Sequence, residues 1–176
     1  MKFTASITLL TVASLAQGLV VPRDQKAVTD VLSGVQAGID NLDTAVKSCC
    51  GNLGGLLDAS NKLIAAITGG TTAVSSSTPL TLIESIKIIK PVQSVEAHAK
   101  TLVGDLKGQK ANIVKAGLCG VFAQQIETIN GDSQQLVKTT VSKVPQIAQS
   151  VATKVAQGIL DVLADAKDSF SAANCK

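Results

Sequence analysis

The sequence predicts an all-α fold, a bundle of five to six helices with a kinked third helix, stapled by two disulfides. Apolar residues recur at three- and four-residue spacing through most of the chain, which is the period of one buried helix face. No segment alternates apolar and polar residues over more than a few positions, so strands are not expected. Four cysteines follow a secretory leader, and an even number of cysteines in a secreted chain favours disulfides.

The first residues have the features of a signal peptide. Lys2 gives a positive start, residues 7–15 form a short apolar stretch, and Ser14-Leu15-Ala16 offers a small-x-small cleavage site. A bilayer core needs about 20 apolar residues, so this stretch is too short for a retained anchor. We expect a signal peptide over residues 1–16, a short segment over 17–23 and a single helical-bundle domain over 24–176. The protein is expected to be secreted and extracellular.

The first two helices are marked by their apolar stripes and by the residues that end them. The first stripe runs from Val28 to Val46 and ends at Cys49-Cys50-Gly51. The second runs from Leu53 to Ile67, and Gly69-Gly70 is expected to end it. A loop of small and hydroxylated residues follows.

The third helix is expected to be interrupted. Thr78 is a candidate N-cap with Pro79 at the first helical position. Pro91 lacks an N–H and clashes with the preceding turn, so it must kink or split this helix.

Two or three further helices complete the bundle. One stripe runs from Ile113 to Ile129, and Asn130-Gly131 is expected to stop it. Another runs from Leu136 to Val144, before Pro145, and a long final helix extends to Phe170.

We expect Cys49, Cys50, Cys119 and Cys175 to form two disulfides. Neighbouring cysteines rarely bond to each other, because a vicinal ring strains the peptide between them. Two pairings remain open: Cys49 with Cys119 and Cys50 with Cys175, or Cys50 with Cys119 and Cys49 with Cys175. No CxxC or HxxxH spacing supports a metal site, so no metal is expected.

Composition excludes several classes of function. Hydrophobic residues make up 45% of the chain but aromatic residues only 2%, so stacking platforms for bases or sugars are missing. A net charge of +3 is too small for electrostatic binding of nucleic acid. No segment after the leader has 18 consecutive apolar residues, so no transmembrane segment is expected.

No catalytic set is found. The one histidine, His98, lies among charged residues of a helix and is interpreted as solvated. Carboxylate pairs such as Asp40 with Asp43 and Asp161 with Asp165 share one helix face opposite an apolar stripe, which favours a solvated outer face. Phosphate-binding loops and nucleophile motifs are absent, so we expect neither an enzyme nor a cofactor.

The chain resembles the fungal hydrophobic surface-binding protein A family, which includes cell-wall mannoproteins and antigenic galactomannoproteins. The likeness begins at Val21-Pro22-Arg23-Asp24 and is clearest at Lys115-Ala116-Gly117-Leu118 and Gln125-Ile126-Glu127-Thr128-Ile129. It continues through Ser133, Lys143-Val144-Pro145 and the final helix. The resemblance implies a secreted, non-enzymatic bundle whose relatives adsorb to hydrophobic surfaces or bind fatty acids in a central apolar cavity.

A lipid-binding role is therefore the first hypothesis, with fatty acids or other lipids as ligands. Apolar residues chosen by stripe position are expected to line the cavity, and polar residues at its mouth are expected to contact a carboxylate head. The expected lining is Ile83, Ile86, Leu102, Leu118, Phe122, Ile126, Leu136, Val151, Val155 and Ile159, and the expected mouth is Gln124, Gln125 and Ser133.

Two alternatives stay open. The first is a protein that adsorbs to hydrophobic surfaces or cell-wall material through its apolar helix faces, or recruits secreted enzymes there. The second is a helical effector or inhibitor of another enzyme. The wall-anchored relatives carry a Ser/Thr-rich tail and an anchor signal, whereas this chain stops at Asn174-Cys175-Lys176, so free secretion is expected.

Overall fold

The computed structural model describes residues 23–48 and 51–176. The predicted signal peptide and most of the segment after it lie outside the described residues. The described part of the chain is all-helical and contains no strand. Its helices are α1 (Arg23–Lys47), α2 (Leu53–Ser75), α3 (Leu82–Lys87), α4 (Ile89–Gly108), α5 (Lys110–Lys115), α6 (Cys119–Lys143) and α7 (Gln146–Ser169).

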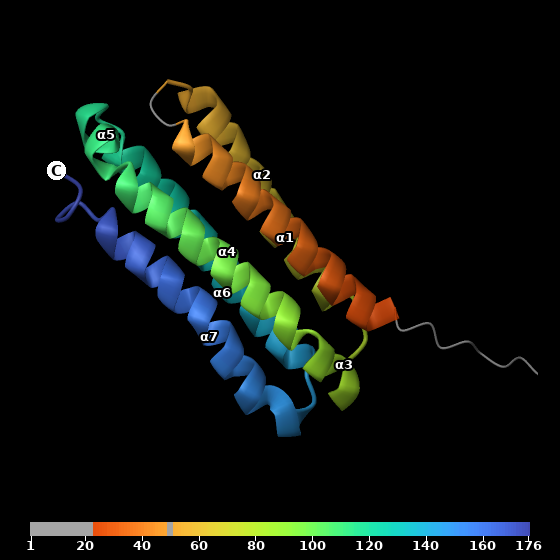
Figure 1. Cartoon of the computed structure of the whole chain (residues 1–176). Coiled ribbons are helices and arrows are strands. Elements are labelled where there is room, and N and C mark those ends of the chain that lie inside the picture. Colours follow the sequence, from red (N-terminus) through yellow and green to blue (C-terminus); the bar gives the residue numbers. More distant parts are fainter. Residues whose placement is uncertain (1–22, 49–50) are drawn as a thin grey trace, which may run out of the picture.

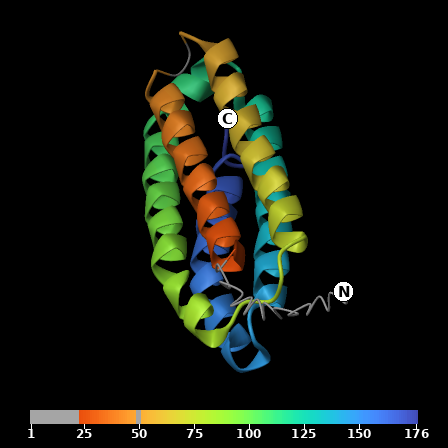
Figure 2. The same cartoon turned by 90° about the vertical axis from the view of Figure 1, so that its right-hand side faces the viewer.

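The five long helices form a closed ring, with α3 at one end and α5 at the other (Figure 1). Around the ring, α1 packs on α2, α2 on α6, α6 on α7, α7 on α4, and α4 on α1. Figure 2 shows α1 and α2 in front, α4 and α6 on either side and α7 behind. Each long helix therefore turns its apolar stripe toward one shared core.

The sequence placed the end of the second helix at Gly69-Gly70, and this prediction is wrong. The helix α2 continues to Ser75, and Gly70 is buried inside it. A Cβ on Gly70 would lie 2.4 Å from Cγ1 of Val31, so this glycine lets α1 and α2 approach closely. The glycine serves helix packing here and does not end a helix.

The predicted stop at Asn130-Gly131 is also wrong, because α6 is continuous from Cys119 to Lys143. Ile129 and Ser133 lie on either side of this pair, and both are buried on the same face. Burial along the whole stripe outweighs the weak helix propensity of asparagine and glycine.

The predicted interruption of the third helix is present. The helix breaks at Ile88, so that α3 and α4 are its two parts, and Pro91 is the third residue of α4. In the first turn of a helix the missing N–H of a proline leaves no intrahelical bond unmade. Counted with α3 and α4 as one broken helix, the described part of the chain has six helices.

The N-cap of α3 is Thr81 and not the predicted Thr78. Thr81 and Glu84 form a capping box, in which Oε2 of Glu84 accepts from the Thr81 N–H at 2.8 Å and Oγ1 of Thr81 accepts from the Glu84 N–H at 3.3 Å. This reciprocal pair starts the helix better than a threonine without an acidic residue three positions later.

Lys143 fixes the loop between α2 and α3 against the end of α6. Its Nζ donates to the carbonyl oxygens of Ser75 at 2.8 Å and Ser77 at 2.6 Å, near the C-terminus of α2. Its own carbonyl oxygen accepts from the N–H of Leu80 at 2.7 Å. The start of α3 is thereby held beside the end of α6.

The disulfide pairing differs from both predicted pairings. Cys119 bonds to Cys175, with the two Cα atoms 5.8 Å apart. Cys119 begins α6 and Cys175 follows α7, and these antiparallel helices of 25 and 24 residues bring the two cysteines to the same end of the bundle. Cys49 and Cys50 lie outside the described residues. We call the end of the bundle that holds this bond the disulfide end. We call the opposite end, where α3 lies, the cavity end.

Removal of the disulfide should destabilise the protein strongly. The bond closes a loop with a sequence separation of 56 residues, for which chain entropy gives about 4 kcal/mol of stabilisation. A Cys119→Ala/Cys175→Ala variant should lose about this much free energy of unfolding in a urea titration. Ala173→Ser, which leaves the crosslink in place, is the control. An unchanged midpoint in the double variant would contradict the prediction.

Candidate functional site

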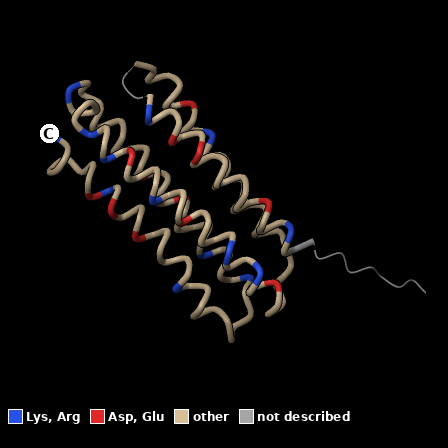
Figure 3. Tube along the Cα trace, in the orientation of Figure 1, with Lys and Arg blue, Asp and Glu red and all other residues tan. Residues whose placement is uncertain are grey.

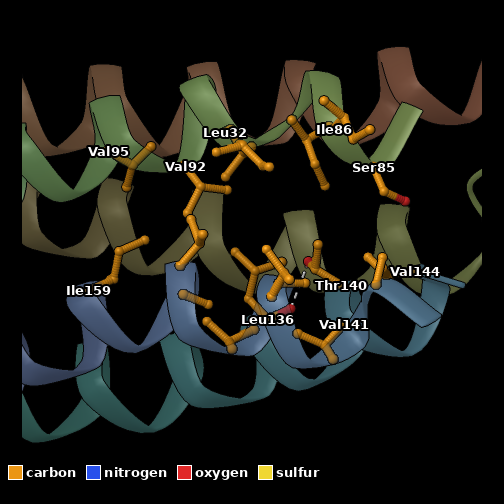
Figure 4. Close-up of a pocket in the computed structure, with 18 of the residues that line it drawn as sticks. Leu32, Ser85, Ile86, Val92, Val95, Leu136, Thr140, Val141, Val144 and Ile159 are labelled. Carbon is orange, nitrogen blue, oxygen red and sulfur yellow. Dashed lines mark hydrogen bonds between the residues drawn. The ribbon is translucent and has the colours of Figure 1, made fainter. Parts of the chain in front are cut away.

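An apolar cavity lies inside the cavity end of the bundle. Its volume is about 280 Å³, close to the lower limit of typical ligand pockets, about 300 Å³. In Figure 4, side chains from α3 and α4 face side chains from α6 and α7 across it. We call it the main cavity; its lining is Leu32, Val35, Ile67, Leu82, Ser85, Ile86, Ile88, Ile89, Val92, Val95, Ser133, Leu136, Val137, Thr140, Val141, Val144, Ile147, Ala148, Val151, Ala152, Val155, Ala156 and Ile159.

Three hydroxyl groups are the polar side chains of this lining, and none of the lining residues is charged. Ser85 donates to the carbonyl oxygen of Thr81 at 2.8 Å, and Thr140 donates to that of Leu136 at 2.8 Å. Both hydroxyls therefore satisfy helix carbonyls and add little polarity. The interior suits a hydrocarbon and not a charged group.

The main cavity opens between α3 and the first turns of α7, where large aliphatic side chains meet solvent. Ile147 is 82% exposed and Ile83 is 67% exposed. Figure 3 shows that the start of α7 carries no charged residue. We call this surface the exposed patch; it consists of Leu82, Ile83, Ile86, Ile147 and Val151.

The predicted lining residues fall into three groups in the structure. Those that line the main cavity are Ile86, Leu136, Val151, Val155 and Ile159. Phe122 and Ile126 line a second, smaller cavity near the disulfide end. Leu102 and Leu118 pack in or against the core without lining either cavity, and Ile83 points into solvent from the exposed patch.

The three predicted mouth residues are also separated. Ser133 lines the main cavity, at its inner end along α6. Gln125 lines the smaller cavity, and its Oε1 accepts from the Ser60 hydroxyl at 2.8 Å. Gln124 is exposed. The opening of the main cavity is instead formed by the exposed patch.

Sequence reasoning missed the contribution of α1 and α4 to the main cavity. Leu32 and Val35 lie on the first stripe, and Val92 and Val95 lie on the stripe that follows Pro91. All four have the correct periodicity for a buried face, but periodicity does not give their height along the bundle. The small side chains on the buried face of α7 are a weak indication of open space in the sequence. They belong to Ala148, Ala152 and Ala156.

The second cavity has a volume of about 50 Å³. It lies between the later parts of α1, α4 and α7 and the earlier parts of α2 and α6, so it is nearer the disulfide end than the main cavity. Its lining is apolar apart from the hydrogen-bonded Ser60 and Gln125. We call it the small cavity.

Charged residues lie outside both cavities and link neighbouring helices. His98 of α4 pairs with Asp40 of α1 on the surface. Asp43 and Lys47 of α1 hold the pKa of the Asp105 carboxyl of α4 below its usual range, and Nζ of Lys47 lies 3.2 Å from Oδ2 of Asp105. In the described ranges, no three His, Cys, Asp or Glu side chains gather as a metal site would require.

None of the helices in residues 23–48 and 51–176 combines the length and the apolar character needed to cross a membrane.

The sequence profile of the hydrophobic surface binding protein A family matches residues 26–142. The chain belongs to this family. The resemblance seen in the sequence is thereby confirmed. Cell wall mannoprotein 1 of Aspergillus flavus is a relative of the family member described here, 26% identical over 171 residues that cover 97% of this chain and 63% of that protein. Cell wall mannoprotein 1 of Aspergillus fumigatus is 27% identical over 172 residues, which cover 97% and 60% of the two chains. The chain spans about three fifths of the length of these relatives.

Two solved structures share the fold of this family member. Ligand-binding domain 2 of the MP1 protein of Penicillium marneffei, complexed with multiple arachidonic acids, superposes with a TM-score of 0.81. It is 22% identical, and the match covers 86% of this chain and 99% of that one. The AFMP4P protein in complex with palmitic acid gives a TM-score of 0.77 at 16% identity, covering 84% of this chain and 100% of that one.

The exposed patch should contribute little to the stability of this family member. Because Ile86 and Ile147 are mostly in solvent, an Ile86→Ser/Ile147→Ser variant should change the free energy of unfolding by less than about 0.5 kcal/mol per site. Ile113→Ser, at a fully buried position, is the contrasting control and should cost several times more. Chemical denaturation followed by circular dichroism measures both. A loss in the double variant equal to that of the control would contradict the prediction.

Proposed function

We propose that this protein is a secreted, non-enzymatic carrier that binds a fatty acid or a similar lipid in the main cavity. The observation that carries the proposal is the lining of that cavity, which is aliphatic apart from three hydroxyl side chains and opens to solvent at one end. Burial of each methylene contributes about 0.8 kcal/mol, so about ten methylenes contribute about 8 kcal/mol against the cost of association.

The proposed lipid lies with its head at the exposed patch and its tail inside. A carboxylate buried without charged partners or several hydrogen-bond donors costs several kcal/mol. The inner end of the main cavity offers a head group one hydroxyl, that of Ser133. The opening between Ile86 and Ile147 instead leaves a head group in water. The exposed lysines Lys87 and Lys90 lie on α3 and the first turn of α4, near that opening.

The solved relatives support this proposal, because they share the fold and were solved with arachidonic acid and with palmitic acid. The cell wall mannoprotein relatives support a place outside the cell or at its wall. The predicted signal peptide over residues 1–16 agrees with that location.

Native mass spectrometry of the purified protein, with and without added palmitic acid, tests the carrier proposal. We expect one bound acyl chain per protein. Ala152→Phe, which places a ring in the main cavity, should weaken binding at least about tenfold in a displacement titration with a fluorescent fatty acid. Ala164→Phe on the exposed face of α7 is the matched control and should bind like the wild type. Absence of any bound acyl chain in the wild type would overturn the proposal.

A second candidate function, adsorption to hydrophobic surfaces, is supported by the exposed patch. Five large aliphatic side chains cluster at one end of the bundle, and such clusters mark interaction sites on soluble proteins. Adsorption through this patch needs no unfolding of the helices.

Depletion from solution over hydrophobic beads tests the adsorption candidate. An Ile83→Ser/Ile147→Ser variant should adsorb about tenfold more weakly, since two aliphatic side chains no longer leave water. Leu53→Ser, at a position 36% exposed at the disulfide end, is the matched control and should adsorb like the wild type. Equal depletion of all three proteins would exclude the patch as the adsorbing surface.

A further inference from the structure

The two cavities lie one above the other along the axis of the bundle. The innermost residues of the main cavity on α1, α2 and α4 are Val35, Ile67 and Val95. On each of these helices, the nearest residue that lines the small cavity is seven or eight positions away in the sequence, toward the disulfide end. Such a gap corresponds to about two helical turns. On α6 and α7 the gap is four positions, about one turn.

Buried aliphatic side chains of α1, α2 and α4 occupy the gap on these three helices. We call this set the partition, and it consists of Ile39, Leu63, Ala99 and Leu102. Leu63 is only 2% exposed, and a Cβ on Gly38 would lie 3.0 Å from its Cδ1. The helices α1 and α2 therefore approach closely at this level, and the partition lies between the levels of the two cavities without lining either of them.

We propose that the partition sets the length of the acyl chain that the protein accepts. This inference rests on the proposed function, with the head of the lipid at the exposed patch and the tail against the partition. Along α7 the main cavity extends from Ile147 to Ile159, about 18 Å of helix. Standard carbon–carbon geometry advances about 1.25 Å per methylene, so about 14 methylenes fill this length in an extended chain.

The small cavity is the space that a longer chain would enter once the partition opens. It is as apolar as the main cavity and lies directly beyond the partition. Leu102 is the partition residue best placed for a test, because it belongs to α4, which packs on both α1 and α7. Truncation of Leu102 removes part of the partition, so under this proposal a longer chain passes toward the small cavity.

Competition among saturated fatty acids tests the inference. The protein is incubated with an equimolar series of even-numbered acids from decanoic to docosanoic acid, and the bound acids are read by native mass spectrometry. Leu102→Ala should move the preferred length upward by about four carbons, which matches one helical turn of about 5.4 Å. Leu106→Ala is the matched control, because it enlarges the small cavity and leaves the partition closed. It should keep the wild-type preference.

The outcomes separate this inference from the proposed function. A shift in Leu102→Ala alone supports the partition as the length determinant. Equal shifts in both variants, or no shift in either, overturn it while leaving fatty-acid binding established. A wild-type protein that binds no acid of the series overturns the proposed function and the inference with it. Leu102→Val provides a milder truncation, with a smaller shift in the same direction, if Leu102→Ala does not fold.

Discussion

The missing N–H of Pro91 is the constraint on which the cavity end depends. An unbroken helix through this region would need Pro91 to donate to the carbonyl four residues earlier, which it cannot do. The chain breaks at Ile88, and α3 turns across the end of the bundle instead of extending α4. The residues on either side of the break, Ile86 and Ile89, then face the same space from two directions. A helix break has thus produced both the main cavity and its opening.

The distribution of side-chain size explains why the larger of the two cavities lies at the cavity end of the bundle. At the disulfide end, Phe122 and Phe170 stack with ring centroids 5.8 Å apart and fill the core between α6 and α7. At the cavity end, α7 presents alanine, valine and isoleucine. Branched aliphatic and small side chains leave the space that large rings would occupy. The low aromatic content of the sequence is therefore a property that the cavity requires.

The sequence predicted the all-α class, the buried faces and the break near Pro91 because these follow from local periodicity and backbone chemistry. It could not place residues along the bundle axis. Leu102 and Phe122 lie on buried faces as expected, yet one belongs to the partition and the other to the small cavity. Gly70 was misinterpreted because its role depends on Val31 of another helix. The pairing of Cys119 with Cys175 was missed because it depends on which helix ends meet.

The disulfide joins the start of α6 to the end of α7, while the short turn at Val144 and Pro145 joins their other ends. These two helices are therefore parts of one covalent ring and cannot separate at either end. The short helix α3 is not part of that ring, and its start is held to the ring by hydrogen bonds at Lys143. The wall of the cavity formed by α6 and α7 is accordingly rigid, and the wall formed by α3 is the one that can yield to an incoming chain.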